Sequence, residues 1–502
     1  MRRAGGSAVR RRARSLKRGC DSGMQFETIL SPLGLLLCVA GLGMLVPALV
    51  DIAADNPDWQ VFLASSFLSG GTGAFLYLGF RDRPGKWRRR EGFLFVSASW
   101  IVLSVAASLP FMLTGIELSA ADAFFEAVSG LTTTGSTVLT GLDNMPPGIL
   151  MWRSILQWTG GVGIVVLSVF LFPFLKLGGQ HLFALESSDT AEKSFARFEE
   201  YATRIILLYL GLTVACMVLY DVLGMSSFDA INHAMTTVST GGYSTSDLSM
   251  GKFHSLPILW VSIVFMWLGA MPFMVLLFLF SARRRYFDVQ IVYFFAVILV
   301  AVVVVVAALR LRNDPINFAT LTSVIFTVTA IITTTGYAYQ DYGGWPAPAI
   351  LAIFLVTLLG GCSGSTSGGL KMFRIVVLVE MCRAAFRRLL WPSAVRSMRY
   401  GRQTIDEDVT IAVATFVLLY SATLVFGAVV LAISGQDLIT SVSASATAIA
   451  NVGPGLGPTV GPAFNFAGLS DFQKMVLSIQ MLLGRLEIMS VLILLAPAFW
   501  RQ

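Results

Sequence analysis

Long apolar segments recur along the whole chain, and they constrain its fold more than any other feature. Ten can be placed, at roughly 28–50, 60–80, 93–114, 149–176, 203–224, 256–281, 289–310, 347–376, 409–433 and 472–499. Each has about 20 residues or more, which is the length that an α-helix needs to cross a bilayer. Only 13% of the 502 residues are charged, against roughly a quarter in soluble domains. The pattern predicts an all-α polytopic membrane protein with ten spans.

Basic residues gather in alternate connections between these segments. Thirty of the 36 Lys and Arg residues lie in the N-terminal arm, in 81–90, 176–204, 283–285 and 371–402, and at Arg501. We assign Arg153, Lys252, Arg310, Arg312 and Lys474 to the opposite connections and Arg485 to a span. By the positive-inside rule, both termini face the cytoplasm. Basic residues spread over several loops favour this reading over a nucleic-acid partner, which we do not expect.

Before the first span lies a basic arm, residues 1–23, which we predict to be cytoplasmic and disordered, and Met24 is an alternative start. The run from Ile29 to Val50 is longer than the ~7–15-residue core of a signal peptide, which favours a retained helix. The five cysteines show no metal-ligand spacing, so neither a zinc site nor a disulfide framework is predicted.

Four shorter, weakly amphipathic stretches lie between the apolar segments, and each runs into a glycine-bearing loop. The aligned loops are AVSGLTTTGSTVL (127–139), AMTTVSTGGYSTS (234–246), VTAIITTTGYAYQ (328–340) and SATAIANVGPGLG (445–457). Gly135, Gly242, Gly336 and Gly453 share one aligned position, which indicates an internal repeat. We predict four tandem units of span, short re-entrant helix, glycine loop and span, with pseudo-fourfold symmetry around one pore. Ordinary extracellular turns are the alternative interpretation.

The predicted domain boundaries follow from this repeat. After the arm come two leading transmembrane helices (24–90), pore repeat 1 (91–180), and pore repeat 2 with a preceding cytoplasmic linker (181–286). Pore repeat 3 (287–376) includes an intramembrane gate loop (360–369), and residues 377–502 hold a basic cytoplasmic linker and pore repeat 4.

Non-helical backbone at membrane depth is stable only where protein buries it or where it lines a watery cavity. Four such loops around one axis would present a ring of carbonyl oxygens, which can replace the hydration shell of a monovalent cation. Glycine permits the positive φ that such a loop needs. Asp143, Asp247 and Asp341 follow the loops and could attract cations to the mouth, or they are solvated loop residues. Glu126 and Asp229, near the starts of short helices, are interpreted as partners of local amides.

The four loops TTTGST, STGGYST, TTTGYAY and NVGPGLG, with two leading spans, resemble the TrkH/KtrB superfamily of potassium transporters. The leading spans and the phrase GGQHLFALESSD (178–189) are similar to its TrkH branch. The resemblance implies one potassium-binding filter, made by Thr133, Thr134, Gly135, Thr240, Gly241, Gly242, Thr334, Thr335, Gly336, Asn451, Val452 and Gly453. It also implies potassium preference, because related plant transporters that prefer sodium carry serine where this chain has Gly135. The fourth loop departs most from the threonine–glycine pattern.

The segment LLGGCSGSTSGGLK (358–371) interrupts the second span of the third repeat with small and polar residues. We predict that the chain leaves the helix here and crosses the cavity below the filter; a packing kink is the alternative. The resemblance implies an intramembrane loop that obstructs the pore and moves on opening. The gate residues are then Gly360, Gly361, Ser363, Gly364, Ser365, Ser367, Gly368, Gly369 and Lys371, of which Lys371 could instead be an anchor at the inner face.

Arg485 lies in the middle of the last span, where a charge costs about 3 kcal/mol or more unless it faces a cavity or a partner. We expect it to face the pore beneath the filter as an electrostatic barrier beside the glycine loop, and the resemblance places an arginine at the gate. A structural ion pair with another subunit or loop is the alternative. Glu487 points to a different helix face, so a pair within the helix is not expected.

The sequence thus predicts gated potassium uptake, with potassium as the permeant ion and no covalently bound cofactor. A symporter coupled to sodium or protons is the nearer alternative, and a membrane enzyme is a remote one, since HExxH and GxSxG motifs are absent. The resemblance implies a homodimer in the bacterial inner membrane and a cytosolic TrkA-type ring that alone would bind nucleotide. The basic segment 371–403 could dock that ring or attract anionic membrane lipids.

Overall fold

The protein is almost entirely helical. The computed structural model describes residues 26–82, 87–175, 191–280, 288–392, 397–401 and 403–501. Its longer elements are α2 (Phe26–Gly43), α3 (Leu45–Ala53), α4 (Trp59–Phe80), α5 (Arg89–Leu113), α6 (Ala120–Leu131), α7 (Pro147–Leu175), α9 (Ala191–Val222), α10 (Ser227–Val238), α11 (Leu256–Ala270), α12 (Phe273–Phe280), α13 (Val289–Leu311), α14 (Phe318–Ile332), α15 (Ala347–Thr357), α16 (Met372–Leu390), α17 (Glu407–Ile433), α18 (Leu438–Ala450) and α19 (Asp471–Arg485). The predicted basic arm and the phrase at 178–189 lie outside the described residues.

Short elements complete the fold. They are the 3-10 turns η1 (Leu142–Asn144), η2 (Ser249–Lys252), η3 (Tyr342–Gly344), η4 (Phe466–Gly468) and η5 (Ile493–Leu495), the helices α20 (Met489–Leu492) and α21 (Pro497–Arg501), and the antiparallel strands β1 (Arg399–Tyr400) and β2 (Gln403–Thr404).

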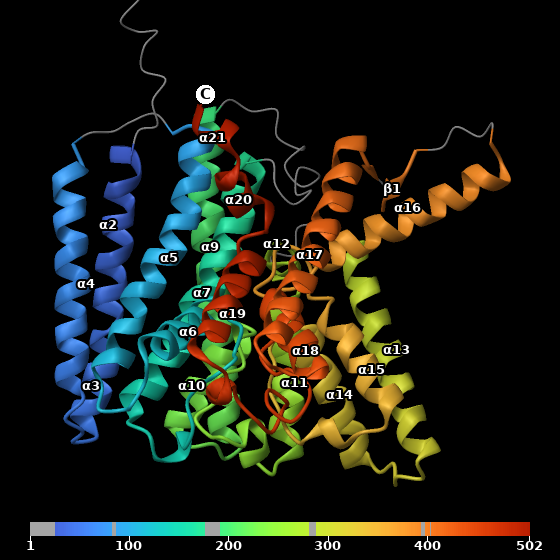
Figure 1. Cartoon of the computed structure of the whole chain (residues 1–502), viewed down its shortest axis with the longest axis horizontal. Helices are drawn as coiled ribbons and strands as arrows, with labels where there is room; N and C mark the ends of the chain where they lie inside the picture. The colour runs from blue at the N-terminus through green and yellow to red at the C-terminus, as the bar shows by residue number, and fades with distance from the viewer. Residues whose placement is uncertain are drawn as a thin grey trace, which may run out of the picture.

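One order of helices recurs four times after the leading elements α2, α3 and α4. A long helix is followed by a short one and then by a second long or broken one: α5–α6–α7, α9–α10–α11/α12, α13–α14–α15/α16 and α17–α18–α19/α20. The leading helices stand at one edge of the bundle, and α16 extends away from it near the opposite edge (Figure 1). This order agrees with the predicted repeat, while the predicted domain boundaries remain predictions.

Several predicted spans are bent or interrupted. Among the described residues, seven helices are long and apolar enough to cross a membrane, or nine if each bent pair is one span. The predicted spans 256–281 and 472–499 are each sharply bent: α11 and α12 meet at 106°, and α19 and the helices after it at 104°. At the first break stands Pro272, which has no backbone N–H to continue the helix. The span 347–376 is interrupted between α15 and α16, as its glycines indicate.

All four short helices begin with a side chain that caps the first turn. Such caps satisfy backbone N–H groups that have no partner within the helix. Ser119 accepts from Asp122 N at 3.1 Å, Ser226 from Asp229 N at 3.1 Å, Asn317 from Thr320 N at 2.8 Å, and Asp437 from Thr440 N at 3.1 Å. The caps fix where each helix starts, and most residues of these helices are buried.

Large apolar side chains are exposed on the outer helices. Phe67 and Phe75 of α4 are 81% and 76% exposed, and Leu311 of α13 and Leu418 of α17 are similarly uncovered. Contiguous exposed apolar surface of this kind is unusual on a soluble monomer and suits contact with lipid. The polar residues of the four loops lie inside this apolar shell, where nearly all of them are buried.

Candidate functional site

The four glycine loops share one backbone conformation. The residue two places before each glycine has a left-handed φ, namely Thr133 at 55°, Thr240 at 52°, Thr334 at 56° and Asn451 at 55°. The glycines themselves have φ of 85° (Gly135), 78° (Gly242), 76° (Gly336) and 112° (Gly453). Positive φ at the glycines is what the sequence predicts. Its adoption by three β-branched threonines is not predicted, and such a conformation costs about 1–3 kcal/mol per residue.

Each short helix also ends with the same hydrogen bond. The amide of the residue before the glycine donates to the carbonyl oxygen five residues earlier: Thr134 to Ser129 at 2.9 Å, Gly241 to Thr236 at 2.9 Å, Thr335 to Ala330 at 2.9 Å, and Val452 to Thr447 at 3.0 Å. This bond, with a left-handed residue beside it, is the Schellman ending of a helix. The four short helices therefore end in the same way, as the aligned sequence pattern predicts.

The four glycines close into a ring. A β-carbon placed on Gly135 would stand 2.3 Å from the carbonyl oxygen of Gly241, and one on Gly242 would stand 1.8 Å from that of Thr335. The series continues from Gly336 to Val452 at 1.8 Å and returns from Gly453 to Thr134 at 2.9 Å. Each glycine therefore lies against the carbonyl that precedes the next glycine. The four loops converge on one centre, and the contact that closes the ring is the loosest.

In two of the four loops, the residue after the ring glycine is a tyrosine that bonds the loop to a neighbouring helix. Tyr243 donates to the carbonyl oxygen of Glu126 at 3.0 Å, and Tyr337 donates to that of His233 at 3.2 Å. Glu126 and His233 stand nine residues before their own ring glycines, so the two contacts are equivalent. Pro454, which follows the fourth glycine, has no hydroxyl. A tyrosine thus ties the second and third loops to the short helix of the repeat before. The fourth loop lacks this tyrosine.

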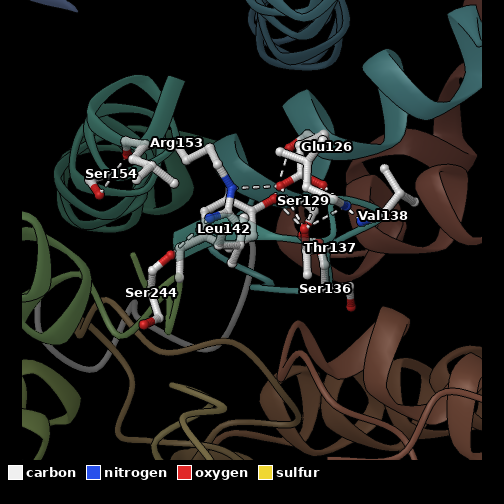
Figure 2. A network of polar contacts seen from close by, with 12 residues as sticks. Glu126, Ser129, Ser136, Thr137, Val138, Leu142, Arg153, Ser154 and Ser244 are labelled. Atoms are coloured by element: carbon white, nitrogen blue, oxygen red, sulfur yellow. Dashed lines mark hydrogen bonds and ion pairs between the residues drawn. The ribbon is translucent and has the colours of Figure 1, made fainter. Parts of the chain in front are cut away.

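A buried ion pair supports the first two loops from outside the ring (Figure 2). Arg153 Nε donates to Glu126 at 2.8 Å, and both side chains are at most 1% exposed. The Glu126 carboxylate also accepts from Val138 N at 3.0 Å, and Arg153 donates to the carbonyl oxygen of Ser244 at 2.9 Å. Glu126 does bind a local amide, as expected, but the sequence does not reveal its charged partner, because it predicts Arg153 in an outer loop. Arg153 lies within α7.

Lys474 is a second correction to the loop assignments. It lies in α19, only 4% exposed, and its Nζ is 2.5 Å from Asp122 of α6. The pair joins the last long helix to the first short helix, so it bridges the two ends of the repeat series. Neither buried pair can be predicted from hydropathy, because its two partners lie on different helices. The spacing of the partners in the sequence carries no signal either.

Gln157 of α7 is a further residue that sequence reasoning missed. Its Nε2 donates to the carbonyl oxygen of Gly241 at 2.6 Å, and its Oε1 accepts from Tyr243 N at 3.0 Å. The side chain is fully buried. One amide group therefore holds the second loop on both sides of Gly242.

The intramembrane loop, residues 358–371, fits into the break between α11 and α12. Cys362 N donates to Ala270 O at 2.9 Å, and Phe273 N donates to Gly364 O at 3.0 Å. Thr366 N donates to Gly269 O at 3.1 Å. The loop therefore supplies partners for backbone groups that the broken helix leaves free. The two interruptions, in different repeats, depend on each other.

The same loop is attached to the glycine ring above it. Thr366 Oγ1 lies 3.1 Å from Thr240 Oγ1, and Gly368 N donates to Thr334 Oγ1 at 2.7 Å. Ser367 Oγ donates to the carbonyl oxygen of Thr333 at 2.7 Å. A β-carbon on Gly368 would stand 2.5 Å from Ala450 O at the base of the fourth loop. The loop therefore lies directly against three of the four glycine loops, through the predicted gate residues Ser367 and Gly368 and through Thr366, which was not among them.

The remaining gate residues make contacts within the loop or with neighbouring helices. Gly360 packs on Gly368 and Gly361 on Ser367, Ser363 N donates to Gln290, Ser365 donates to Cys362 O, Gly369 (φ 71°) packs on Leu359, and Lys371 Nζ donates to Ser367 O. Lys371 has a φ of 62°, which is uncommon for a lysine. Its bond turns the side chain back onto the loop, a geometry that suits the gate interpretation better than that of an anchor.

Arg485 lies beside the intramembrane loop. Its two terminal nitrogens donate to Thr366 O at 2.9 Å and to Gly160 O at 3.3 Å, and the side chain is 3% exposed. Its hydrogen bonds are to main-chain oxygens, whereas Glu487 pairs with Arg374 of α16. A cavity of about 20 Å³, room for roughly one water, lies between Arg485, Lys371 and the glycines of the loop. The predicted juxtaposition of Arg485 and the glycine loop is present.

The three mouth aspartates all accept hydrogen bonds, two of them from a neighbouring loop and Asp341 from its own loop. Asp143 accepts from Ser246 Oγ at 2.9 Å, and Asp247 accepts from Gly141 N at 2.8 Å, so the two tie the outer loops of the first and second repeats together. Asp341 accepts from Gly343 N at 2.8 Å and caps η3. Asp229 also lies here: burial raises the pKa of its carboxyl group, but bonds from Thr245 and Ser226 and the charge of Lys252 outweigh burial and lower it. A role in attracting cations remains a prediction.

Four short helices whose glycine loops meet in one ring, inside a shell of apolar helices, define a multi-pass membrane transport protein. Comparison with known proteins agrees, since residues 59–502 match the TrkH family, described as cation transport proteins. The chain is also 40% identical to the Trk system potassium uptake protein TrkI of Halomonas elongata, over 97% of this chain and 99% of that one. The chain belongs to the TrkH family.

Two further relatives agree in extent. The Trk system potassium uptake protein TrkH of Escherichia coli K12 is 34% identical, over 95% of this chain and all of its own length. The crystal structure of the potassium transporter TrkH from Vibrio parahaemolyticus superposes with a TM-score of 0.88 at 35% identity, covering 95% of this chain and all of that chain. The fold predicted from the sequence, an all-α polytopic membrane protein of this superfamily, is confirmed.

Proposed function

We propose that this protein takes up potassium across the bacterial cytoplasmic membrane through a gated pore. The observation that carries the proposal is the closed ring of Gly135, Gly242, Gly336 and Gly453, in which each glycine lies on the carbonyl before the next. A ring of main-chain oxygens suits a dehydrated monovalent cation. The names of the relatives favour potassium among such ions. The filter comprises the twelve loop residues named from the sequence.

The intramembrane loop and Arg485 form the gate in this proposal. The loop lies against the base of three ring loops, and Arg485 holds its Thr366 carbonyl. A guanidinium group in the path of a cation raises the electrostatic barrier to its passage. Opening then requires the loop to move away from the ring and from Arg485.

The protein functions with partners in this proposal. Its relatives are named as components of a Trk system, which favours a separate cytosolic TrkA-type ring as the site of nucleotide control. We also propose a homodimer, contact of α16 with the inner membrane surface, and cytoplasmic termini, the last from the placement of basic residues. Membership of a transport family favours transport over the enzyme alternative.

Growth rescue tests the function directly. The full chain, expressed with and without a TrkA-type subunit in a bacterial strain deficient in potassium uptake, should restore growth at low external potassium. Failure with the subunit present and the protein in the membrane would contradict the proposal. In planar bilayers with opposed potassium and sodium gradients, the current through a channel reverses at the potential set by the gradients of its permeant ions alone. A reversal potential displaced from that value by a fixed transport stoichiometry would establish the symporter alternative instead.

A further inference from the structure

Gln157 makes a contact to the ring that sets the second loop apart. The four carbonyl oxygens that face a neighbouring glycine belong to Thr134, Gly241, Thr335 and Val452. Within the part of the chain that the structure describes, the Gly241 oxygen is the one to which a side chain donates, at 2.6 Å from Gln157 Nε2. The donor comes from α7 of the preceding repeat, so the contact also joins two repeats at the ring.

The second loop carries a glycine where the other three loops carry a side chain. At the position of Gly241 the other loops carry Thr134, Thr335 and Val452. Thr134 Oγ1 lies 2.7 Å from Thr132 Oγ1, and Thr335 Oγ1 lies 2.8 Å from Thr333 Oγ1. These hydroxyl pairs stiffen the first and third loops behind the carbonyls that face the ring.

Gln157 occupies the place that a threonine side chain would need in the second loop. A β-carbon on Gly241 would stand 2.4 Å from both Cδ and Oε1 of Gln157. Ser239, at the position of Thr132, would still offer a hydroxyl to such a threonine. The glutamine and the glycine are therefore one arrangement, in which a side chain from α7 replaces the loop's own hydroxyl pair.

We propose that Gln157 is a positioning residue that determines how well the ring distinguishes potassium from smaller cations. The inference rests on the proposed function, because it assumes that the ring binds the permeant ion. Two effects follow from the geometry. First, the Gln157 amide binds the residues on both sides of Gly242 and so fixes the distance of the second loop from its neighbours in the ring. Second, its N–H occupies a lone pair of the Gly241 oxygen, which weakens the attraction of that oxygen for a cation.

The permeability ratio of potassium to sodium is the quantity to measure. The full chain is reconstituted with a TrkA-type subunit, and reversal potentials are recorded for the wild type, Gln157→Ala and Gln157→Met. Methionine keeps the side-chain volume and removes both hydrogen bonds. We expect both variants to lower the ratio roughly fivefold, the equivalent of one net hydrogen bond. Thr159→Ala, on the exposed face of α7 two residues away, is the control and should keep the wild-type ratio.

Compensation separates a role in positioning from a merely structural one. Gly241→Thr alone should abolish conduction, because its side chain collides with Gln157. The double variant Gln157→Ala/Gly241→Thr should recover conduction and a ratio near that of the wild type, since the threonine fills the vacated space and reaches Ser239. Recovery in the double variant supports the proposal even if Gln157→Ala alone does not conduct.

Two results would overturn the inference. One is a conducting Gln157→Met channel with the wild-type ratio, and the other is a double variant no better than the worse single one. Either could occur while the wild type remains a selective potassium pathway, which would leave the proposed function intact. A wild-type protein that conducts no potassium would instead refute the proposed function itself.

Discussion

The glycine ring and the region beneath it, made by the loop at 358–371 and Arg485, are built on opposite plans. In the ring, each of the four repeats contributes one glycine, one left-handed residue before it and one Schellman hydrogen bond. Beneath it, the third repeat alone contributes the intramembrane loop and the fourth contributes Arg485. The ring is fourfold and made of main chain, while the region beneath it is made by a single loop and a single arginine.

This difference explains what each region can do. Four equal contributions suit an environment that surrounds an ion evenly and changes little. A single loop, held by a few hydrogen bonds, can move without dismantling the other three repeats. Substitutions in the ring should therefore alter which ion passes, or whether any passes, whereas substitutions below it should alter how often the pathway is open.

The strongest test of the ring is Gly242→Ala. Its β-carbon would stand 1.8 Å from Thr335 O, and the left-handed φ alone costs about 1–2 kcal/mol for a residue with a side chain. We expect loss of potassium uptake of well over tenfold. Rubidium or potassium influx into cells, normalised to protein in the membrane, measures it. Gly71→Ala, where nothing lies within 4 Å of an added β-carbon, should transport normally, and equal activity of the two variants would contradict the ring.

The corresponding test of the region beneath the ring is Arg485→Ala. It removes two hydrogen bonds from a charged group to main-chain oxygens, each worth about 1.5–3 kcal/mol, and a positive charge near the path. We expect basal flux without activating nucleotide to rise about tenfold, with an unchanged potassium-to-sodium ratio. Flux from proteoliposomes provides the measurement, and Arg501→Ala serves as control. Lower flux at normal protein levels would assign Arg485 a structural role instead.

An effect of about the same size, but on ion selection rather than on flux, is expected from Gly135→Ser. The serine β-carbon would press on the Gly241 carbonyl at 2.3 Å and displace one oxygen of the ring. We expect the potassium-to-sodium permeability ratio to fall by about tenfold, given strain of about 1–3 kcal/mol, while conduction persists. Bi-ionic reversal potentials report the change. An unchanged ratio would count against the assignment of Gly135 to the filter.

The mildest variant, Tyr337→Phe, sharpens the comparison among the loops themselves. The hydroxyl lies 2.6 Å from Thr236 Oγ1 and 3.2 Å from His233 O, and its loss should lower stability by about 1 kcal/mol. Thermal unfolding in detergent should show a slightly lower midpoint, with transport retained. Tyr77→Phe, on the half-exposed surface of α4, is the control. Equal unfolding midpoints for the two variants would show that the Tyr337 hydroxyl does not stabilise the third loop.

Repetition made much of this site predictable from sequence. The four aligned glycines, their positive φ and the interruption at 358–371 all leave local patterns, because a residue type or a composition change marks each one. Repetition also supported the assignment of the fourth loop, whose own sequence signal is weak. Asn451 has the same left-handed conformation as the three threonines although the fourth loop differs in sequence.

Contacts between separate helices were the part that sequence could not supply. Gln157 and Gly241 belong to different repeats, and Arg153 and Glu126 lie on different helices of the first repeat, so each pair meets only after the helices pack. The breaks before α12 and after α19 were missed for a related reason. Both segments are apolar enough to read as continuous helices, and the partner that makes the first break favourable, Gly364, belongs to another repeat.

The left-handed threonines have a consequence for anyone who would engineer this protein. Glycine at Thr240 or Thr334 would relieve backbone strain and, judged by that strain alone, should raise the melting temperature. The same exchange would delete the hydroxyls that hold Thr366 and Gly368 in place. A thermostabilised version obtained in this way should therefore leak, because heat tolerance and a tight seal make opposite demands on the same two positions.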